Sequence, residues 1–208
     1  MKYLLSLIFI LLLGLSVSAQ KKKSKPVVAP RPPGFDYVPA TAKCSLKSEN
    51  FGAIRGLKLG MTVDQVKEIF LTLDFVSDES SLIQTIIVLP KGSEFSGIRG
   101  IAFEFFENKA VSFFLSYEHD IEWNSIAEFR MQVSSAMKLP TGIWSDSIDI
   151  DGTGVSAAEC QDFKVLLSLL NTNGRLGYSV RVEKNNFRQE AQDKVKADKE
   201  KQKKQFKP

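Results

Sequence analysis

The segment Gly56–Val66 carries the strongest local folding signal in the chain, because it specifies where a helix starts. Thr62 followed three residues later by Gln65 is a capping box, in which each side chain accepts a hydrogen bond from the other residue's backbone amide. Met61 and Val66 stand on either side of this start at the spacing of a hydrophobic staple. The segment therefore predicts a helix that begins at residue 63 and buries one apolar side against the rest of the fold.

A second helix is predicted where Ser125 and Glu128 repeat the capping-box spacing. Pro140 marks its end, since proline cannot continue a helix. The apolar residues in between recur every three or four positions, which is typical of a helix with one buried side. These positions are Ile126, Phe129, Val133, Ala136 and Met137.

Runs of alternating apolar and polar residues predict strands around the two helices. The predicted strands are residues 82–89, 98–106, 110–117, 160–170 and 175–183, with a short sixth strand at 143–150. We therefore expect an α+β fold, in which an antiparallel sheet of five to six strands is covered by two helices on one face.

The spacing of these features indicates a tandem repeat of helix, strand and hairpin. Sixty-three residues separate Thr62 from Ser125, and the same number separates Asn108 from Asn171, the two predicted hairpin tips. The two halves share almost no sequence identity, and helices and hairpins are common units, so coincidental spacing is the alternative.

Residues 1–19 have the pattern of a secretory signal peptide: a lysine, an apolar run from Leu4 to Val17 and a small-residue cleavage site before Gln20. The apolar run of 14 residues is shorter than the roughly 20 that a membrane span needs. We therefore expect this segment to be removed, which would leave no transmembrane span and an exported chain, periplasmic or extracellular.

Charge divides the rest of the chain into three parts. Residues 20–43 are rich in lysine and proline and carry a net charge of +5, which predicts a solvated linker. Residues 44–183 carry −7 and are expected to form a single domain, and residues 184–208 carry +5 and are expected to be disordered or a solvated helix. The acidic domain argues against a nucleic-acid partner. Residues 20–43 and 184–208, which we call the basic arms, suit an anionic surface.

Cys44 and Cys160 are the only two cysteines. In an exported chain an even number of cysteines favours pairing, so we predict a disulfide between them. The alternative is two buried free thiols that behave as small apolar residues.

The candidate chemical sites are weak. Asp149 to Thr153 resembles the nucleophile motif of haloacid-dehalogenase phosphotransferases, but too little sequence follows it for that enzyme fold. The same residues can be aligned with a calcium loop, but Cys160 stands where the last calcium ligand belongs. We interpret it as an acidic turn. His119 is expected to be a solvated loop residue, and the glycine-rich residues 92–100 lack the lysine of a phosphate loop. We expect no cofactor, no metal and no catalytic residue.

Trp123 and Trp144 flank the second helix, and we expect them to pack on its ends. A surface binding role is the alternative for this pair.

Leu59-Gly60-Met61-Thr62, with Val66 four residues on, resembles the helix start of the small outer-membrane β-barrel-assembly lipoproteins and of the β-lactamase inhibitory proteins. The resemblance covers about a dozen residues, and the lipid-attachment cysteine of the lipoproteins is missing. It implies helix-plus-antiparallel-sheet repeats and a binding module without catalytic residues.

We therefore expect an exported, non-enzymatic module that binds an unknown protein, ligand or envelope component. Phe106 and Phe114, on the mixed face of the sheet, are the predicted binding surface, and the loops between Pro90 and Gly97 are the alternative. The alternatives are an envelope-associated structural protein that uses its basic arms, and a hydrolase of unknown class.

Overall fold

The computed structural model describes residues 35–70, 74–76, 82–88, 95–118, 123, 125–149, 153–172 and 175–205. The chain divides into two units, Met1–Pro33 and Gly34–Pro208, and every described residue belongs to the second. The predicted signal peptide and the first 15 residues of the predicted linker lie outside the described residues.

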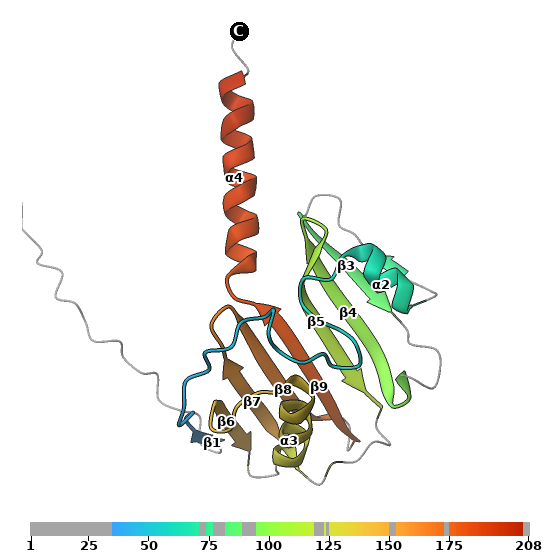
Figure 1. Ribbon diagram of the computed structural model, residues 1–208, viewed down its shortest axis with the longest axis vertical. Helices are drawn as coiled ribbons and strands as arrows, with labels where there is room; N and C mark the ends of the chain where they lie inside the picture. The colour runs from blue at the N-terminus through green and yellow to red at the C-terminus, as the bar shows by residue number, and fades with distance from the viewer. Residues whose placement is uncertain are drawn as a thin grey trace, which may run out of the picture. The chain divides into compact units, whose positions relative to one another are not determined.

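The second unit is built on one antiparallel sheet of nine strands in the order β1-β6-β7-β8-β9-β5-β4-β3-β2 (Figure 1). The described part of the chain also contains three helices. The strands are β1 Phe35–Val38, β2 Asp74–Val76, β3 Ile83–Val88, β4 Ile98–Phe106, β5 Lys109–Tyr117, β6 Trp144–Asp149, β7 Gly154–Glu159, β8 Phe163–Thr172 and β9 Arg175–Lys184, and the helices are α2 Val63–Ile69, α3 Ile126–Met137 and α4 Phe187–Gln205.

The predicted sheet of five to six strands with two helices is therefore wrong, although the fold is α+β. Three of the strands were not predicted: β1, β2 and β7. β7 has the sequence Gly-Val-Ser-Ala-Ala-Glu, which has little intrinsic strand preference. It is a strand because β6 and β8 pair with it on both sides and because Ser156 and Ala158 are fully buried. β1 lies within the predicted linker and pairs with β6.

The two halves of the sheet have the same connectivity. α2 is followed by the four-strand meander β2 to β5, and α3 is followed by the meander β6 to β9. The last strands of the two meanders, β5 and β9, pair with each other at the centre of the sheet. Each half thus has one strand more than the helix, strand and hairpin that the sequence predicted.

The core lies on the face of the sheet that the two shorter helices cover. Alternate residues of the central strands are fully buried there, including Phe103, Phe113, Leu167 and Val180. Figure 1 shows α3 against β7 and β8, and Val66 of α2 belongs to the same core as the buried stripe of α3. The apolar positions predicted for the stripe of α3 are buried, apart from the exposed Ala136.

The predicted capping box of α2 is present, and at α3 the structure shows the Ser125 half of the predicted box. Thr62 Oγ1 accepts from the Gln65 amide at 3.2 Å and the Thr62 amide donates to Gln65 Oε1 at 2.9 Å, which completes the capping box of α2. At α3, the Glu128 amide donates to Ser125 Oγ at 3.2 Å. These bonds satisfy backbone donors that the first turn of a helix leaves without partners.

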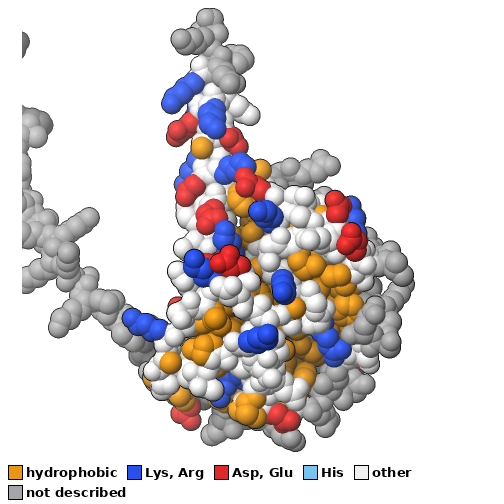
Figure 2. Space-filling model, viewed as in Figure 1, with side chains coloured by type: hydrophobic (Ala, Val, Ile, Leu, Met, Phe, Trp, Pro, Cys, Tyr) orange, Lys and Arg blue, Asp and Glu red, His pale blue; other side chains and the backbone are white. Residues whose placement is uncertain are grey.

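The predicted tail forms α4, and its first turns are docked on the hairpin of β4 and β5. Phe187 and Ala191 are buried, Arg188 Nη2 lies 2.6 Å from Glu104 Oε1, and Lys194 pairs with Glu107. Beyond residue 191 most side chains of the helix are exposed and many are charged, as Figure 2 shows. None of the described helices has the length and apolarity of a membrane span.

Candidate functional site

The predicted surface residues Phe106 and Phe114 both lie on the outer face of the sheet, opposite α2 and α3, but the structure does not bring them into one site. Phe106 is half-buried beside α4, with Lys194 Nζ 5.7 Å from its ring centroid. Phe114 is half-buried farther along the sheet, with Arg181 Cζ 5.6 Å from its ring centroid. The docked helix α4 thus occupies one end of the predicted surface.

The remaining part of that face holds a hollow of about 460 Å³ around Phe114 and Leu166. Lys164 and Glu183 pair across its floor at 2.7 Å, and Arg181 lies 3.9 Å from Glu183. Lys164, Arg181 and Glu183 are therefore engaged with one another.

A larger groove, of about 670 Å³, lies on the other face between α3 and the β1–β6 edge of the sheet. We call it the α3–β1 groove. Its apolar side chains include Val38, Met131, Leu139 and Trp144, and its charged side chains are Arg130, Lys138 and Asp146. Met131 is 65% exposed and Val38 is 52% exposed, so large apolar side chains face solvent on both of its walls.

Backbone contacts hold the two walls of the groove together. α3 ends at Lys138, whose φ of 56° is left-handed and stops the helix. The following turn reaches Gly142, whose carbonyl oxygen accepts from the amides of Thr41 at 2.8 Å and Ala42 at 2.9 Å. The segment after β1 is therefore tied to the loop after α3. A side chain at Gly142 would meet the Thr41 hydroxyl at 2.7 Å, and φ there is +77°, so the turn requires glycine.

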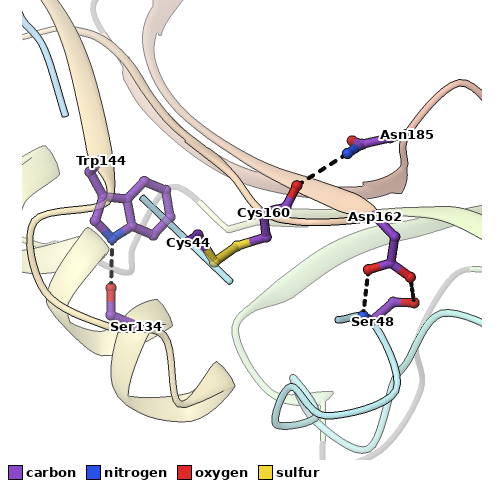
Figure 3. The surroundings of a disulfide bond; sticks show 7 residues. All are labelled: Cys44, Ser48, Ser134, Trp144, Cys160, Asp162 and Asn185. Atoms are coloured by element: carbon purple, nitrogen blue, oxygen red, sulfur yellow. Dashed lines mark hydrogen bonds between the residues drawn. A yellow bond between two sulfur atoms is a disulfide. The ribbon is translucent and has the colours of Figure 1, made fainter. Parts of the chain in front are cut away.

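The floor of the groove is a set of polar contacts between α3 and the sheet. Trp144 Nε1 donates to Ser134 Oγ at 3.0 Å (Figure 3). Asp146, which is 8% exposed, pairs with Arg130 and also accepts from the Ser156 hydroxyl. A buried carboxylate with a cation and a hydroxyl as partners is a satisfied group, so this floor orients α3 on the sheet.

A second hollow, of about 480 Å³, lies at the same edge of the sheet on the outer face. We call it the disulfide hollow, because Cys44 and Cys160 line it together with Tyr37, Lys43 and Glu159. The two cysteines form the predicted disulfide, with their Cα atoms 4.5 Å apart, which confirms the pairing (Figure 3).

Polar contacts beside the disulfide reinforce it (Figure 3). Ser48 donates its amide and its hydroxyl to the two carboxylate oxygens of Asp162, each at 2.7 Å. Asn185 Nδ2 donates to the Cys160 carbonyl at 3.2 Å. The segment that follows β1 is thus attached to the turn between β7 and β8.

The other predicted candidates form no site among the described residues. His119, residues 150–152 and residues 91–94 lie outside them, and the Asp149 amide donates to the Thr153 carbonyl at 2.7 Å. Within the described ranges no three His, Cys, Asp or Glu residues are grouped so as to hold a metal ion. The two tryptophans pack on α3 as predicted. The ring centroids of Trp123 and Phe129 are 4.5 Å apart, and Trp144 donates a hydrogen bond to Ser134 near the other end of the helix.

Sequence reasoning missed the α3–β1 groove. Arg130 and Asp146 are 16 residues apart on different elements, and Val38 lay in the predicted linker, so no local pattern joined them. The one available signal was Met131, an apolar residue on the polar side of the predicted α3 stripe.

No protein family, curated protein or solved structure matches the chain. The resemblance of the α2 start to the lipoproteins and inhibitory proteins therefore stays a prediction.

Proposed function

We propose that this chain is an exported, non-enzymatic protein-interaction module that binds its partner through the α3–β1 groove. The observation that carries the proposal is the groove itself: Met131 and Val38 are more than half exposed on facing walls of one concavity. Contiguous exposed apolar side chains mark interaction sites, and the volume of the groove is in the range typical of binding sites.

The charged groups of the groove favour binding over catalysis. Asp146 receives hydrogen bonds on both carboxylate oxygens, from Arg130 and Ser156, so its contacts are structural. The charges of Arg130 and Asp146 cancel, so Lys138 leaves the groove with a net charge of +1, and a guanidinium that already bonds one carboxylate keeps further donors for another. These groups suit a partner that presents apolar side chains and a carboxylate.

The disulfide supports the proposed export. Disulfides persist in oxidising compartments and are rare where thiols are kept reduced, and Cys44 and Cys160 are paired. Recovery of a secreted or periplasmic chain that begins at Gln20, shown by intact mass, would test this part of the proposal. A chain that retains residues 1–19 in the cytoplasm would contradict it.

The binding proposal is tested by site-specific photo-crosslinking in the cells that make the protein. A photoreactive amino acid at Met131 should give a defined crosslinked protein, because this side chain faces the groove. The matched control is the same amino acid at Gln132, the next residue of α3, which is exposed but does not line the groove. Lys138→Glu should weaken the Met131 crosslink. Equal crosslinking from both positions, or none from Met131, would overturn the proposal.

One observation favours a second function, attachment to an anionic surface through α4. Residues 194–204 contain six lysines and two acidic residues, and nearly all of these side chains are exposed or half-exposed. Retention of the chain on phosphatidylglycerol vesicles at low salt, lost at high salt and in the Lys199→Glu/Lys203→Glu variant, would support this function. Retention that does not respond to salt or to these substitutions would exclude it.

A further inference from the structure

The helices on the core face leave one end of the sheet uncovered. α3 lies against β7 and β8, and the next two strands of the sheet are β6 and β1 (Figure 1). The α3–β1 groove lies between α3 and this end. We propose that the groove takes an amphipathic α-helix of a partner protein, which packs beside α3 and runs antiparallel to it. This inference rests on the proposed function and names the form in which the groove takes its partner.

The groove has the width of one helix. Neighbouring strands of a sheet lie about 4.8 Å apart, so the centre of the β1–β6 pair lies roughly 10 Å from the centre of the β7–β8 pair that α3 covers. Two packed helices lie about 8–10 Å apart, measured between their axes. A helix laid over β1 and β6 would therefore contact α3 on one side and the sheet beneath it.

The wall that α3 gives to the groove has the form of a helix-packing surface. Five residues of α3 line the groove in two rows at a spacing of four, Arg130-Ser134-Lys138 and Met131-Ser135. Such rows are the ridges by which helices pack against each other. Ser134 and Ser135 are small, so a second helix can come close between the longer side chains. Val38 and Trp144 supply apolar surface on the side of the sheet.

Two exposed charges stand at opposite ends of the groove. Lys138 is at the end of α3. β6 runs back along α3 from Ser134 to Arg130, which are the α3 partners of its first and third residues. β1 pairs with β6, and Asp36 precedes Val38 by two residues, so it lies on the same face of β1 and beyond Arg130 in this direction. The exposed Asp36 therefore lies toward the start of α3.

These charges fit a helix of one polarity. Arg130 and Asp146 pair in the middle of the groove, so their charges cancel, and Glu128, the remaining carboxylate of α3, does not line the groove. Helices favour acidic residues in the first turn and basic residues in the last, because of the helix dipole. A helix antiparallel to α3 would begin beside Lys138 and end beside Asp36, so each of its charged ends would meet an opposite charge.

A second copy of this chain offers no suitable helix among its described residues. The apolar sides of α2 and α3 are buried in the core of their own copy. α4 is largely exposed beyond residue 191, but Val195 is its only large apolar residue there. The helix that fits belongs to another protein. It has apolar residues three and four positions apart, an Asp or Glu in its first turn and a Lys or Arg in its last.

The test begins with phage-displayed peptides of about 18 residues, or five helical turns, selected on the exported chain, residues 20–208. Their background is alanine-rich and one face is randomised. An enriched peptide should gain helicity on binding, as measured by circular dichroism. Proline in place of an outward-facing alanine in the middle of the peptide should weaken binding about a hundredfold, because it breaks the helix. Serine at the same position is the matched control and should change binding little.

Variants of α3 locate the peptide. Ser135→Phe places a large side chain in the groove and should weaken peptide binding about tenfold or more. The matched control is Gln132→Phe, an exposed position of α3 that does not line the groove. Circular dichroism of the chain would confirm that both variants are folded.

Charge exchange and a spin label determine the direction of the helix. Lys138→Glu should weaken binding about threefold, and a lysine in place of the acidic residue in the first turn of the peptide should restore it. Asp36→Lys should be compensated in the same way by an acidic residue in the last turn. A nitroxide on the first residue of the peptide should broaden the NMR signals of amides near Lys138 and leave those near Ile126 sharp.

Four outcomes would overturn the inference. A peptide that is displaced by Ser135→Phe but tolerates proline would be an extended occupant. Broadening near Ile126 in place of Lys138 would reverse the direction of the helix. Failure to enrich any peptide sensitive to Ser135→Phe would remove a helix from the groove, whereas the proposed function would still be decided by the Met131 crosslink. A dimer that forms with concentration and is abolished by Ser135→Phe would assign the groove to a second copy.

Discussion

Removing the disulfide should cost a large part of the stability of the fold. The bond joins residues 116 apart in sequence, so it closes a loop of 117 residues. The chain-entropy relation gives about 4.9 kcal/mol at 25 °C for a loop of this length, which is an upper figure because residual structure in the denatured chain reduces it. We expect Cys44→Ala/Cys160→Ala to lower the free energy of unfolding by about 3 to 4 kcal/mol.

The contacts around the bond explain why this loss arises mainly in the unfolded state. In the variant, Ser48 still bonds Asp162, and the Gln161 amide still donates to the Leu46 carbonyl at 3.1 Å. The amides of Thr41 and Ala42 still bond the Gly142 carbonyl. The native position of this segment is therefore specified without the sulfur atoms, and the double variant should fold to the same structure.

Urea denaturation followed by circular dichroism measures the effect. The variant should unfold at lower urea with a larger m-value, because its denatured chain is free to expand. Its melting temperature should fall by about 10 °C. The native chain with a reductant present should behave as the variant does, and the reductant should not change the variant. A loss below about 1 kcal/mol with an unchanged m-value would refute this reasoning.

Three further results are expected. Thr62→Ala removes the hydroxyl of the α2 cap and should lower the free energy of unfolding by about 1 kcal/mol in the same urea assay; no change would mean that the cap is redundant. Gly52→Ala would place a methyl group 2.2 Å from the Ala136 carbonyl oxygen, so a loss of about 2 kcal/mol or more is expected, and a stabilised variant would contradict that geometry. The hydrogen bond from Lys194 lowers the pKa of Glu107. This contact is therefore fully present above the ordinary pKa of a glutamate and is lost as pH falls through the lowered value. NMR titration should follow the loss, and Glu107→Gln should remove the pH dependence.

Local signals in the sequence predicted the parts of the fold that depend on local chemistry. The start of α2 follows from two side chains three residues apart, Thr62 and Gln65, which bond each other's backbone. In the four longest strands apolar residues recur at every second position because one face of each is buried in the core, although the other face also carries apolar residues such as Phe114 and Leu166. The disulfide followed from the cysteine count and the expected compartment, and the structure bears it out.

The parts that were missed depend on neighbours that are distant in the sequence. β7 is made of small and polar residues and becomes a strand only because β6 and β8 lie on either side of it. α4 has few apolar residues, but Phe187 and Ala191 suffice to bury its first turns while salt bridges to Glu104 and Glu107 hold it on the hairpin. Neither outcome has a signature within the segment itself.

The candidate site depends both on local sequence signals and on contacts between distant segments. The sequence therefore predicted some of its residues but not the site itself. Trp144 and Cys160 were singled out from the sequence, yet the groove and the hollow that they line exist because β1 pairs with β6. That pairing places a strand from the predicted linker at the edge of the sheet, where Gly142 and the disulfide hold the segment that follows it. The disulfide and one wall of the α3–β1 groove thus depend on the same segment. Because the Thr41 and Ala42 amides still bond the Gly142 carbonyl without the sulfur atoms, Cys44→Ala/Cys160→Ala should leave the photo-crosslink from Met131 unchanged in conditions where the domain stays folded. A weaker crosslink there would show that the disulfide itself orders the groove.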